Sequence, residues 1–404
     1  MRPLKNILYL TLMILSFAII NPTSGQEQEP IRLNEVAWSP DGSLIAVAGG
    51  NTNGCNLTPD PSATIFLLDA ITGEVRQTLV GSLCDVRSLG WNAVGSRLAS
   101  ADFDSTFRIW DPLTGQQVAE SEPNRSRADV VWSPDNTKIA NIWTEHFAVE
   151  LLDASTVVSL KILGLEPRFA VYKVLEVDWS PDSTQLVSIG RKSFQLPDSF
   201  LHVWDVQTGE LLVEEDLQGI ATHVDWNAEG SQIIVGARDG TISVFNTASY
   251  DLANRFSVDE SPTYVKWHPF LSVVAIGSTS ETSSLTIWEI EDGTPRQIDA
   301  VEGTRGIGDW SPFGGRFVFV PSPFEVPTDN DAEPFSMVVP LASLDLLEGI
   351  MQRCEKVAAT DSDLTVPSTE ALLPDFIDAV SASEELTPAC AADLTAVAVK
   401  LQGQ

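Results

Sequence analysis

The chain has 404 residues, of which 43% are hydrophobic and 20% charged, as expected of a soluble globular protein with a large core or more than one domain. It carries 56 Asp and Glu against 24 Lys and Arg, which gives a net charge of -32. This charge opposes attraction to nucleic acid or to an anionic membrane face, so we expect neither partner.

The first 25 residues have the pattern of a signal peptide. Arg2 and Lys5 precede an uncharged run from Ile7 to Ile20, and the small residues Thr23 and Gly25 follow at the usual cleavage offsets. The run is short for a bilayer-spanning helix, which needs about 20 residues. We therefore predict an exported protein (secreted, periplasmic or at the cell surface) with residues 1–25 removed and no membrane insertion afterwards. The alternative is an uncleaved anchor.

The chain has four cysteines, which fall into two pairs by position: Cys55 with Cys84, and Cys354 with Cys390. In an exported chain an even number of cysteines favours disulfides, so we predict these two bridges. The alternative is four free thiols in a reducing compartment.

A short motif recurs seven times from residue 38 onwards. Each copy is a Trp followed by a polar turn, as in WSPDG from Trp38 and WNAEGS from Trp226, and successive copies are 53, 41, 47, 47, 41 and 43 residues apart. These spacings are close to the period of about 40 to 45 residues that is typical of four-stranded propeller blades. The repeat therefore predicts the fold.

Each repeat contains the same predicted order of strands. An alternating strand ends at the Trp, a small apolar strand follows the turn, and a third and a more polar fourth strand complete the unit. Such a sheet is apolar on both faces and needs a neighbour on each side, which a closed ring provides. We predict an all-β fold, a seven-bladed β-propeller over residues 26–340, with a small α-helical C-terminal extension over residues 341–404.

At these residues the chain resembles the WD40-repeat family, over about residues 31–340. The best copy is LASADFDSTFRIWD, from Leu98 to Asp111. The resemblance implies that Ser100, Asp104 and Trp110 belong to a structural hydrogen-bond network, although Ser82 stands where the family has a His. It also implies a non-catalytic platform that binds a protein partner.

Closure of the ring is the difficult step. Only about twelve residues separate Gln26 from Trp38, too few to supply an outer strand for the last blade. We expect the seventh blade to have at best a short outer strand, with its open edge covered by the C-terminal tail.

The tail after residue 340 changes period. Leu344, Leu347 and Met351 recur at helical spacing, and Thr387 followed by Pro388 has the pattern of an N-cap and a first helical residue. We therefore expect helices at both ends of the tail, and the second cysteine pair would join them.

No established catalytic motif occurs in the sequence: it lacks the nucleophile elbow, the phosphate-binding loop and the zinc-binding helix motif. The four histidines match no zinc spacing, and we interpret His202, His223 and His268 as packed blade residues. Acidic pairs such as Asp102 and Asp104 arise easily among 56 acidic residues. We predict no enzyme, no cofactor and no metal. The alternatives are a propeller enzyme or small-ligand binder at the mouth of the central channel, and a structural envelope component.

One loop stands out as a candidate partner-binding site. In a propeller, the loops from the second to the third strand and from the fourth to the next first strand share one rim. On that rim GRKSFQLPDSF brings together Arg191, Lys192 and Phe194 in a chain that is poor in bases. Arginine and aromatic residues are favoured interface anchors. The alternative is an exposed hairpin turn without a partner.

Overall fold

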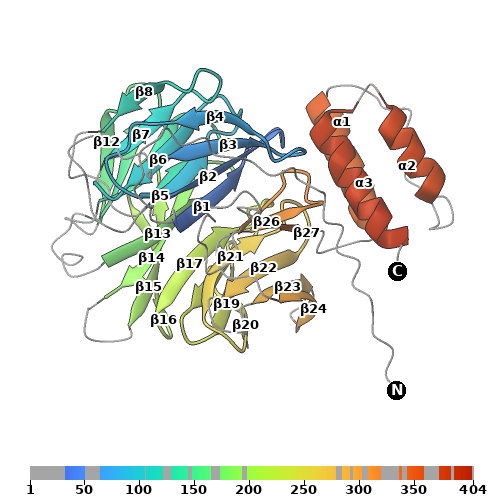
Figure 1. Cartoon of the computed structure of the whole chain (residues 1–404). Coiled ribbons are helices and arrows are strands. Elements are labelled where there is room, and N and C mark those ends of the chain that lie inside the picture. Colours follow the sequence, from blue (N-terminus) through green and yellow to red (C-terminus); the bar gives the residue numbers. More distant parts are fainter. Residues whose placement is uncertain are drawn as a thin grey trace.

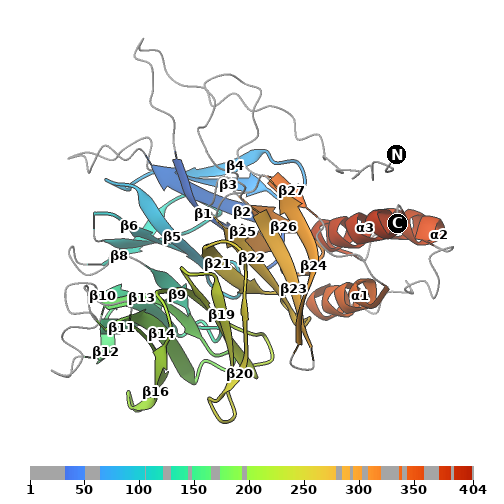
Figure 2. The same cartoon turned by 90° about the horizontal axis from the view of Figure 1, so that it is seen from below.

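The computed structural model describes residues 32–50, 64–104, 106–121, 129–143, 148–164, 173–192, 198–278, 284–291, 294–302, 308–319, 336–338, 344–358, 373–383 and 386–402. The strands of this part of the chain form sheets arranged in a ring, and the helices lie together beside the ring (Figure 1). Figure 2 shows the same arrangement from below.

Six of the described sheets have four strands, and each strand pairs antiparallel with the next strand along the chain. Blades 1 to 3 consist of β1 (Arg32–Trp38), β2 (Leu44–Gly50), β3 (Ile65–Asp69) and β4 (Val75–Leu79); β5 (Val86–Trp91), β6 (Leu98–Asp102), β7 (Phe107–Trp110) and β8 (Gln117–Glu120); and β9 (Val130–Trp132), β10 (Lys138–Trp143), β11 (Ala148–Asp153) and β12 (Ser159–Leu163). Blades 4 to 6 consist of β13 (Lys173–Trp179), β14 (Gln185–Arg191), β15 (Ser199–Asp205) and β16 (Leu211–Leu217); β17 (Ala221–Trp226), β18 (Gln232–Ala237), β19 (Thr241–Asn246) and β20 (Leu252–Ser257); and β21 (Pro262–Trp267), β22 (Val273–Ser278), β23 (Ser284–Glu291) and β24 (Thr294–Glu302).

The prediction of seven blades is wrong. Six sheets are complete blades, and the last sheet has only three strands within the described residues: β25 (Gly308–Trp310), β26 (Phe317–Phe319) and β27 (Ser336–Val338). The repeated Trp marks a first strand and carries no information on whether a fourth one follows. Within the described residues, β1 is the first strand of the chain, and it belongs to blade 1 and not to this sheet.

The three-stranded sheet nevertheless joins blade 6 to blade 1. Its Trp310 and Phe317 pack with Tyr264 of blade 6, and its Val318 packs with Trp38 of blade 1. The ring is therefore continuous through side-chain packing at this position.

The recurring tryptophans hold neighbouring blades together. Each is the last residue of a first strand, and the indole N–H of Trp179 donates to the carbonyl oxygen of Val131 in the preceding blade at 3.1 Å. Trp91 makes the equivalent bond to Ala37 at 3.3 Å. The indole N–H groups of Trp38, Trp132, Trp226 and Trp267 have no hydrogen-bond partner among the described residues. The feature that the repeated tryptophans share is therefore the large apolar surface of the ring, packed at the end of each first strand.

A β-bulge interrupts the first strand of five blades at the same position. In blades 2, 4 and 5 the extra residues are Arg87, Leu175 and Thr222. A bulge re-aims side chains and commonly lies beside a functional surface. These three residues all lie at the rim where the second and third strands are joined.

Three helices follow the sheets: α1 (Leu344–Ala358), α2 (Leu373–Ala382) and α3 (Pro388–Gln402). They share a hydrophobic core that includes Leu347, Phe376 and Leu394, and a disulfide joins Cys354 in α1 to Cys390 in α3. The N–H of Cys390 donates to the Thr387 hydroxyl at 3.3 Å, so Thr387 caps α3 as its sequence predicts. No helix among the described residues has both the length and the apolarity needed to cross a membrane.

Candidate functional site

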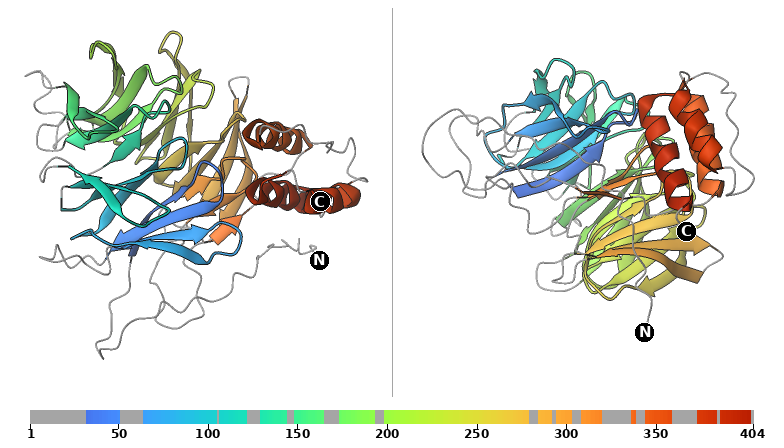
Figure 3. Two further views of the ribbon diagram at one scale, coloured as in Figure 1. Left: turned by 90° about the horizontal axis from the view of Figure 1, so that it is seen from above. Right: turned by 45° about the vertical axis from the view of Figure 1, so that its right-hand side comes forward.

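The propeller has two rims, and the helices occupy one of them. The helix-bearing rim consists of the turns between first and second strands and between third and fourth strands. The opposite rim consists of the loops between second and third strands and those that lead to the next blade. Figure 3 shows the helices beside the last sheet and blades 1 and 6.

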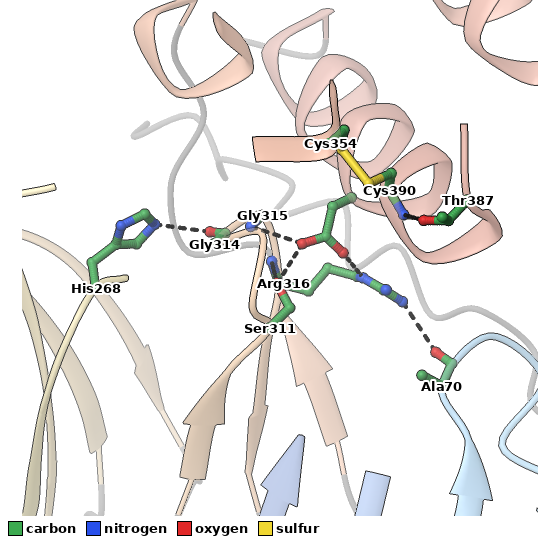
Figure 4. Close-up of polar contacts among 10 residues, drawn as sticks. Ala70, His268, Ser311, Gly314, Gly315, Arg316, Cys354, Thr387 and Cys390 are labelled. Carbon is green, nitrogen blue, oxygen red and sulfur yellow. Dashed lines mark hydrogen bonds and ion pairs between the residues drawn. A yellow bond between two sulfur atoms is a disulfide. The ribbon is translucent and has the colours of Figure 1, made fainter. Parts of the chain in front are cut away.

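Asp393 of α3 fixes the helices to the last sheet through three residues of that sheet, Ser311, Gly315 and Arg316, which Figure 4 labels. Its carboxylate accepts hydrogen bonds from the Ser311 hydroxyl and, at 2.9 Å, from the Gly315 N–H, and it forms an ion pair with Arg316. Arg316 also donates to the carbonyl oxygen of Ala70 at 3.1 Å. Asp393 is fully buried and Arg316 nearly so, so the contact is sealed from water.

In blades 1, 3 and 4 a local Asp makes the same bonds. Asp182 lies three residues after Trp179, and its carboxylate accepts from the Ser180 hydroxyl at 2.6 Å and from the Thr184 N–H at 3.0 Å. In the last sheet the equivalent position is Phe313, which is buried in the core of the helices instead. Asp393 therefore completes this turn from a distant part of the chain.

Further contacts extend this attachment to neighbouring blades. Arg353 of α1 donates to the carbonyl oxygen of Pro312 at 2.9 Å, and its guanidinium lies 5.3 Å from the centroid of the Phe270 ring in blade 6. Lys400 of α3 pairs with Asp299 on β24 at 3.2 Å. The tail was expected to cover the open edge of the last sheet; the described contacts lie instead at the β25–β26 turn and on blade 6.

The candidate partner-binding loop is described only in part. Arg191 ends β14 and is half-buried, and Lys192 follows it and pairs with Asp216 of β16. Phe194 lies outside the described residues. The structure thus places Arg191 and Lys192 on the opposite rim. Their surroundings differ, because Lys192 pairs with a carboxylate and Arg191 pairs with none among the described residues.

The same rim also carries an arginine beside an aromatic ring, a pair that was not identified from the sequence. Phe103, in the loop between β6 and β7, is 51% exposed although it is a large apolar side chain. The guanidinium of Arg87 lies 4.7 Å from the centroid of its ring. A cation–π contact of this kind stabilises the exposed pair, and both residue types are common at protein interfaces.

The residues implied by the family resemblance lie together in blade 2. The indole N–H of Trp110 donates to the Ser100 hydroxyl at 3.0 Å. Asp104 binds the Arg108 guanidinium at 2.8 Å, and Arg108 also pairs with Asp102. Burial raises the pKa of Asp102 to about 7, although the Arg108 charge acts in the opposite direction. These groups form a local structural network, and the Asp102 and Asp104 pair is bridged by an arginine.

Carboxylates on first strands accept hydrogen bonds from backbone N–H groups of the next blade. Asp178 accepts from the Trp226 N–H at 2.7 Å, Asp225 accepts from the Trp267 N–H at 2.7 Å, and Asp309 accepts from the Trp38 N–H at 2.9 Å. Burial raises the pKa of Asp178 to about 7 and that of Asp309 to about 6. These groups satisfy backbone donors at the free edges of first strands. Among the described residues, no cluster of His, Cys, Asp and Glu has the arrangement of a metal site.

The histidines have distinct surroundings. The ring of His268 lies 3.0 Å from the Gly314 carbonyl oxygen through Nε2, and Nδ1 accepts from the Leu271 N–H at 3.1 Å, so it is a packed turn residue as expected. His202 stacks on Phe200 within blade 4. The Nδ1 atom of His223, by contrast, is buried without a hydrogen-bond partner in the described part of the chain.

The cysteines predicted from spacing are bonded where the structure describes them. Cys354 and Cys390 form a disulfide with a Cα–Cα distance of 5.7 Å. Cys84 is also disulfide-bonded, and its expected partner Cys55 lies outside the described residues.

With this geometry established, we compared the chain with known proteins. The family WD domain, G-beta repeat, matches residues 73–111 and 216–246. Protein HIR1 of Cryptococcus neoformans is 26% identical over 197 residues, covering 43% of this chain and 22% of its own length. The WD repeat-containing protein slp1 of Schizosaccharomyces pombe is 22% identical over 280 residues, covering 66% of this chain and 52% of its own length. The matches thus span at most about half of these relatives.

A solved structure shows the same fold. The β-propeller domain of Myceliophteria thermophila Cps50 (Swd1) superposes with a TM-score of 0.60 at 21% identity, covering 72% of this chain and 94% of that one. The resemblance to the WD40-repeat family is thereby confirmed: WD40 repeats occur in two regions and the chain folds as a β-propeller.

The relatives contradict the prediction of an exported protein. HIR1, slp1 and THO complex subunit 3 of Arabidopsis thaliana point away from export. The prediction rested on two basic residues before a short apolar run, in a segment outside the described residues. Two basic residues before a short apolar run are a local pattern, which by itself does not establish export. The prediction is therefore wrong.

Proposed function

Since the chain carries WD40 repeats and folds as a β-propeller, we propose that it is a non-catalytic platform for a protein partner. We assign the platform to the propeller (residues 26–340) and the attached helices to a separate extension (residues 341–404). The partner would bind the opposite rim, because the helices take up part of the helix-bearing rim through Asp393 and Arg353.

The pair of Arg87 and Phe103 carries this proposal. The guanidinium of Arg87 lies over the ring of the half-exposed Phe103, and Arg and aromatic side chains are among the residue types that dominate binding energy at protein interfaces. Arg191 and Lys192 lie on the same rim, two blades further along the ring. Because the protein is acidic, basic and aromatic groups that lie on one rim favour that rim as the surface that a partner would bind.

The test is affinity capture with the full chain as bait and a double variant, R87A with F103A. The matched control is L113A, because Leu113 is 88% exposed in the turn between β7 and β8 on the helix-bearing rim. We expect one protein to co-purify in stoichiometric amount with the wild type and with L113A, but not with the double variant. Retention of every partner by the double variant, at unchanged melting temperature, would contradict the proposal.

A further inference from the structure

A pocket of about 430 Å³ lies between blades 4 and 5 on the opposite rim. Its walls come from the start of β13 and the end of β14 in blade 4, and from the start of β17 and the residue after β18 in blade 5. This volume is in the usual range for sites that hold a small molecule. Its lining includes the apolar residues Leu175 and Ile220.

The charged residues of the lining are all basic. Lys173, Arg191 and Arg238 line the pocket, and no carboxylate is among the described residues that line it. The chain has only 24 Lys and Arg against 56 Asp and Glu, so a lining with three cations and no described carboxylate runs against its overall composition. The adjacent Lys192, in contrast, is neutralised by Asp216.

The strand register brings two of these cations face to face. Lys173 of β13 is directly opposite Arg191 of β14 in the antiparallel ladder. Like charges at directly opposed positions destabilise a sheet. An anion bound between them would convert this repulsion into attraction, and a guanidinium can bind phosphate or carboxylate through two parallel hydrogen bonds.

Two polar atoms at the pocket also lack partners. Nε of Arg191 and Nδ1 of His223 are buried and make no hydrogen bond with any described residue. Buried polar groups are normally satisfied, so each such atom calls for a ligand or water. Burial lowers the pKa of His223 to about 4, so its ring is neutral near pH 7 and offers a hydrogen bond rather than a charge.

We infer that this pocket binds a small organic anion. Its phosphate or carboxylate group lies among Lys173, Arg191 and Arg238, and its apolar part packs on Leu175 and Ile220. The pocket shares Arg191 with the rim proposed for the protein partner, but Arg87 and Phe103, on which that proposal rests, belong to blade 2, whereas the pocket lies between blades 4 and 5.

The experiment is calorimetric titration of the full chain with phenyl phosphate, benzoate and inorganic phosphate at constant ionic strength. The variants are R191Q and R238Q, and the matched control is R76Q, which removes the same charge from an exposed arginine on β4. We expect saturable 1:1 binding of phenyl phosphate or benzoate, weakened at least about tenfold in R191Q and R238Q and changed less than about twofold in R76Q. The comparison of the two organic probes distinguishes a phosphate from a carboxylate ligand.

A second measurement does not need the ligand. Without an anion, R191Q should melt at a higher temperature than the wild type, because Lys173 loses its like-charged neighbour; K173Q is the alternative should R191Q fold poorly. Absence of saturable binding, or equal binding by wild type and R191Q, would overturn the inference. Equal affinity for inorganic phosphate and phenyl phosphate would overturn the assignment of an apolar part. The double variant R87A with F103A should bind the anionic probes as the wild type does. The two proposals can therefore fail independently of each other.

Discussion

The carboxylate of Asp393, in the last helix, accepts a hydrogen bond from Ser311, in a turn of the last sheet 82 residues earlier. The WSPD repeats make this bond locally, as Ser180 does with Asp182. The last repeat has Phe313 at the position of the Asp, and this Phe is buried among the helices. One departure from the repeat therefore creates both an apolar anchor and a turn that needs a carboxylate from elsewhere.

The first prediction concerns this carboxylate. Replacing Asp393 with Asn should leave Arg316 as a buried charge without its partner, and breaking a buried ion pair in this way costs about 3 to 5 kcal/mol of stability. Hydrogen exchange should show faster exchange over α1 to α3. The control is D182N, which alters the same turn bonds at an exposed site and should cost only about 1 kcal/mol. An equal loss in both variants would argue against a special role of Asp393.

The second prediction concerns the disulfide between Cys354 and Cys390, which closes a sequence separation of 36 residues. Loop entropy gives it a stabilising contribution of about 3 to 4 kcal/mol. C390S should therefore lower the melting temperature of the helical unit, as followed by helical circular dichroism. C84S, which removes a bonded cysteine from the propeller, should leave this helical transition in place. A helical transition unchanged in C390S would show that packing alone holds the helices.

The strands were predictable from sequence because their signal is local and repeated. Each of the seven tryptophans of the repeated motif ends a first strand, and Thr387 caps the last helix, as their immediate neighbours in sequence predict. The number of complete blades was not predictable in this way. A fourth strand is polar and variable, and the Trp motif carries no information about it.

Features that depend on distant residues escaped prediction. Asp393 is one of 56 acidic residues, and nothing in its helix shows that it replaces a missing Asp in a turn. The basic pocket draws on the ends of strands in two blades, and its cations are far apart in sequence. Arg191 was found because it lies beside Lys192, but its approach to Lys173 follows from the strand register.

The third prediction is a dependence of stability on pH. Burial raises the pKa of Asp178 to about 7 and that of Asp309 to about 6, above the value of about 3.9 in an unfolded chain. The folded state therefore binds more protons than the unfolded state between about pH 4 and 7, and stability falls as the pH rises through this range. Turn carboxylates such as Asp153, whose hydrogen bonds lower its pKa to about 2, act in the opposite direction below about pH 4.

Urea unfolding at pH 5 and pH 8 measures this effect, and we expect a lower midpoint at pH 8. D178N keeps an oxygen to accept the Trp226 N–H but cannot ionise, so its midpoint should fall less between the two pH values. D205N, at an exposed turn Asp with a lowered pKa, should fall as much as the wild type. A wild-type midpoint that rises from pH 5 to pH 8 would contradict the prediction.

The fourth prediction concerns the bond between Trp110 and Ser100 in blade 2. Trp110 is 1% exposed and packs between blades 1 and 2, so W110A should destabilise the protein by about 3 to 5 kcal/mol. S100A leaves the buried indole N–H without an acceptor and should cost about 1 to 3 kcal/mol. W110F removes the donor and part of the ring, and because S100A and W110F disrupt the same bond, the double variant should cost less than the sum of the two.

Chemical denaturation measures the stability of these variants, with L113A as an exposed control that should change stability by no more than about 0.5 kcal/mol. Strict additivity would mean that the hydrogen bond contributes nothing beyond packing, whereas a neutral W110A would remove Trp110 from the core altogether.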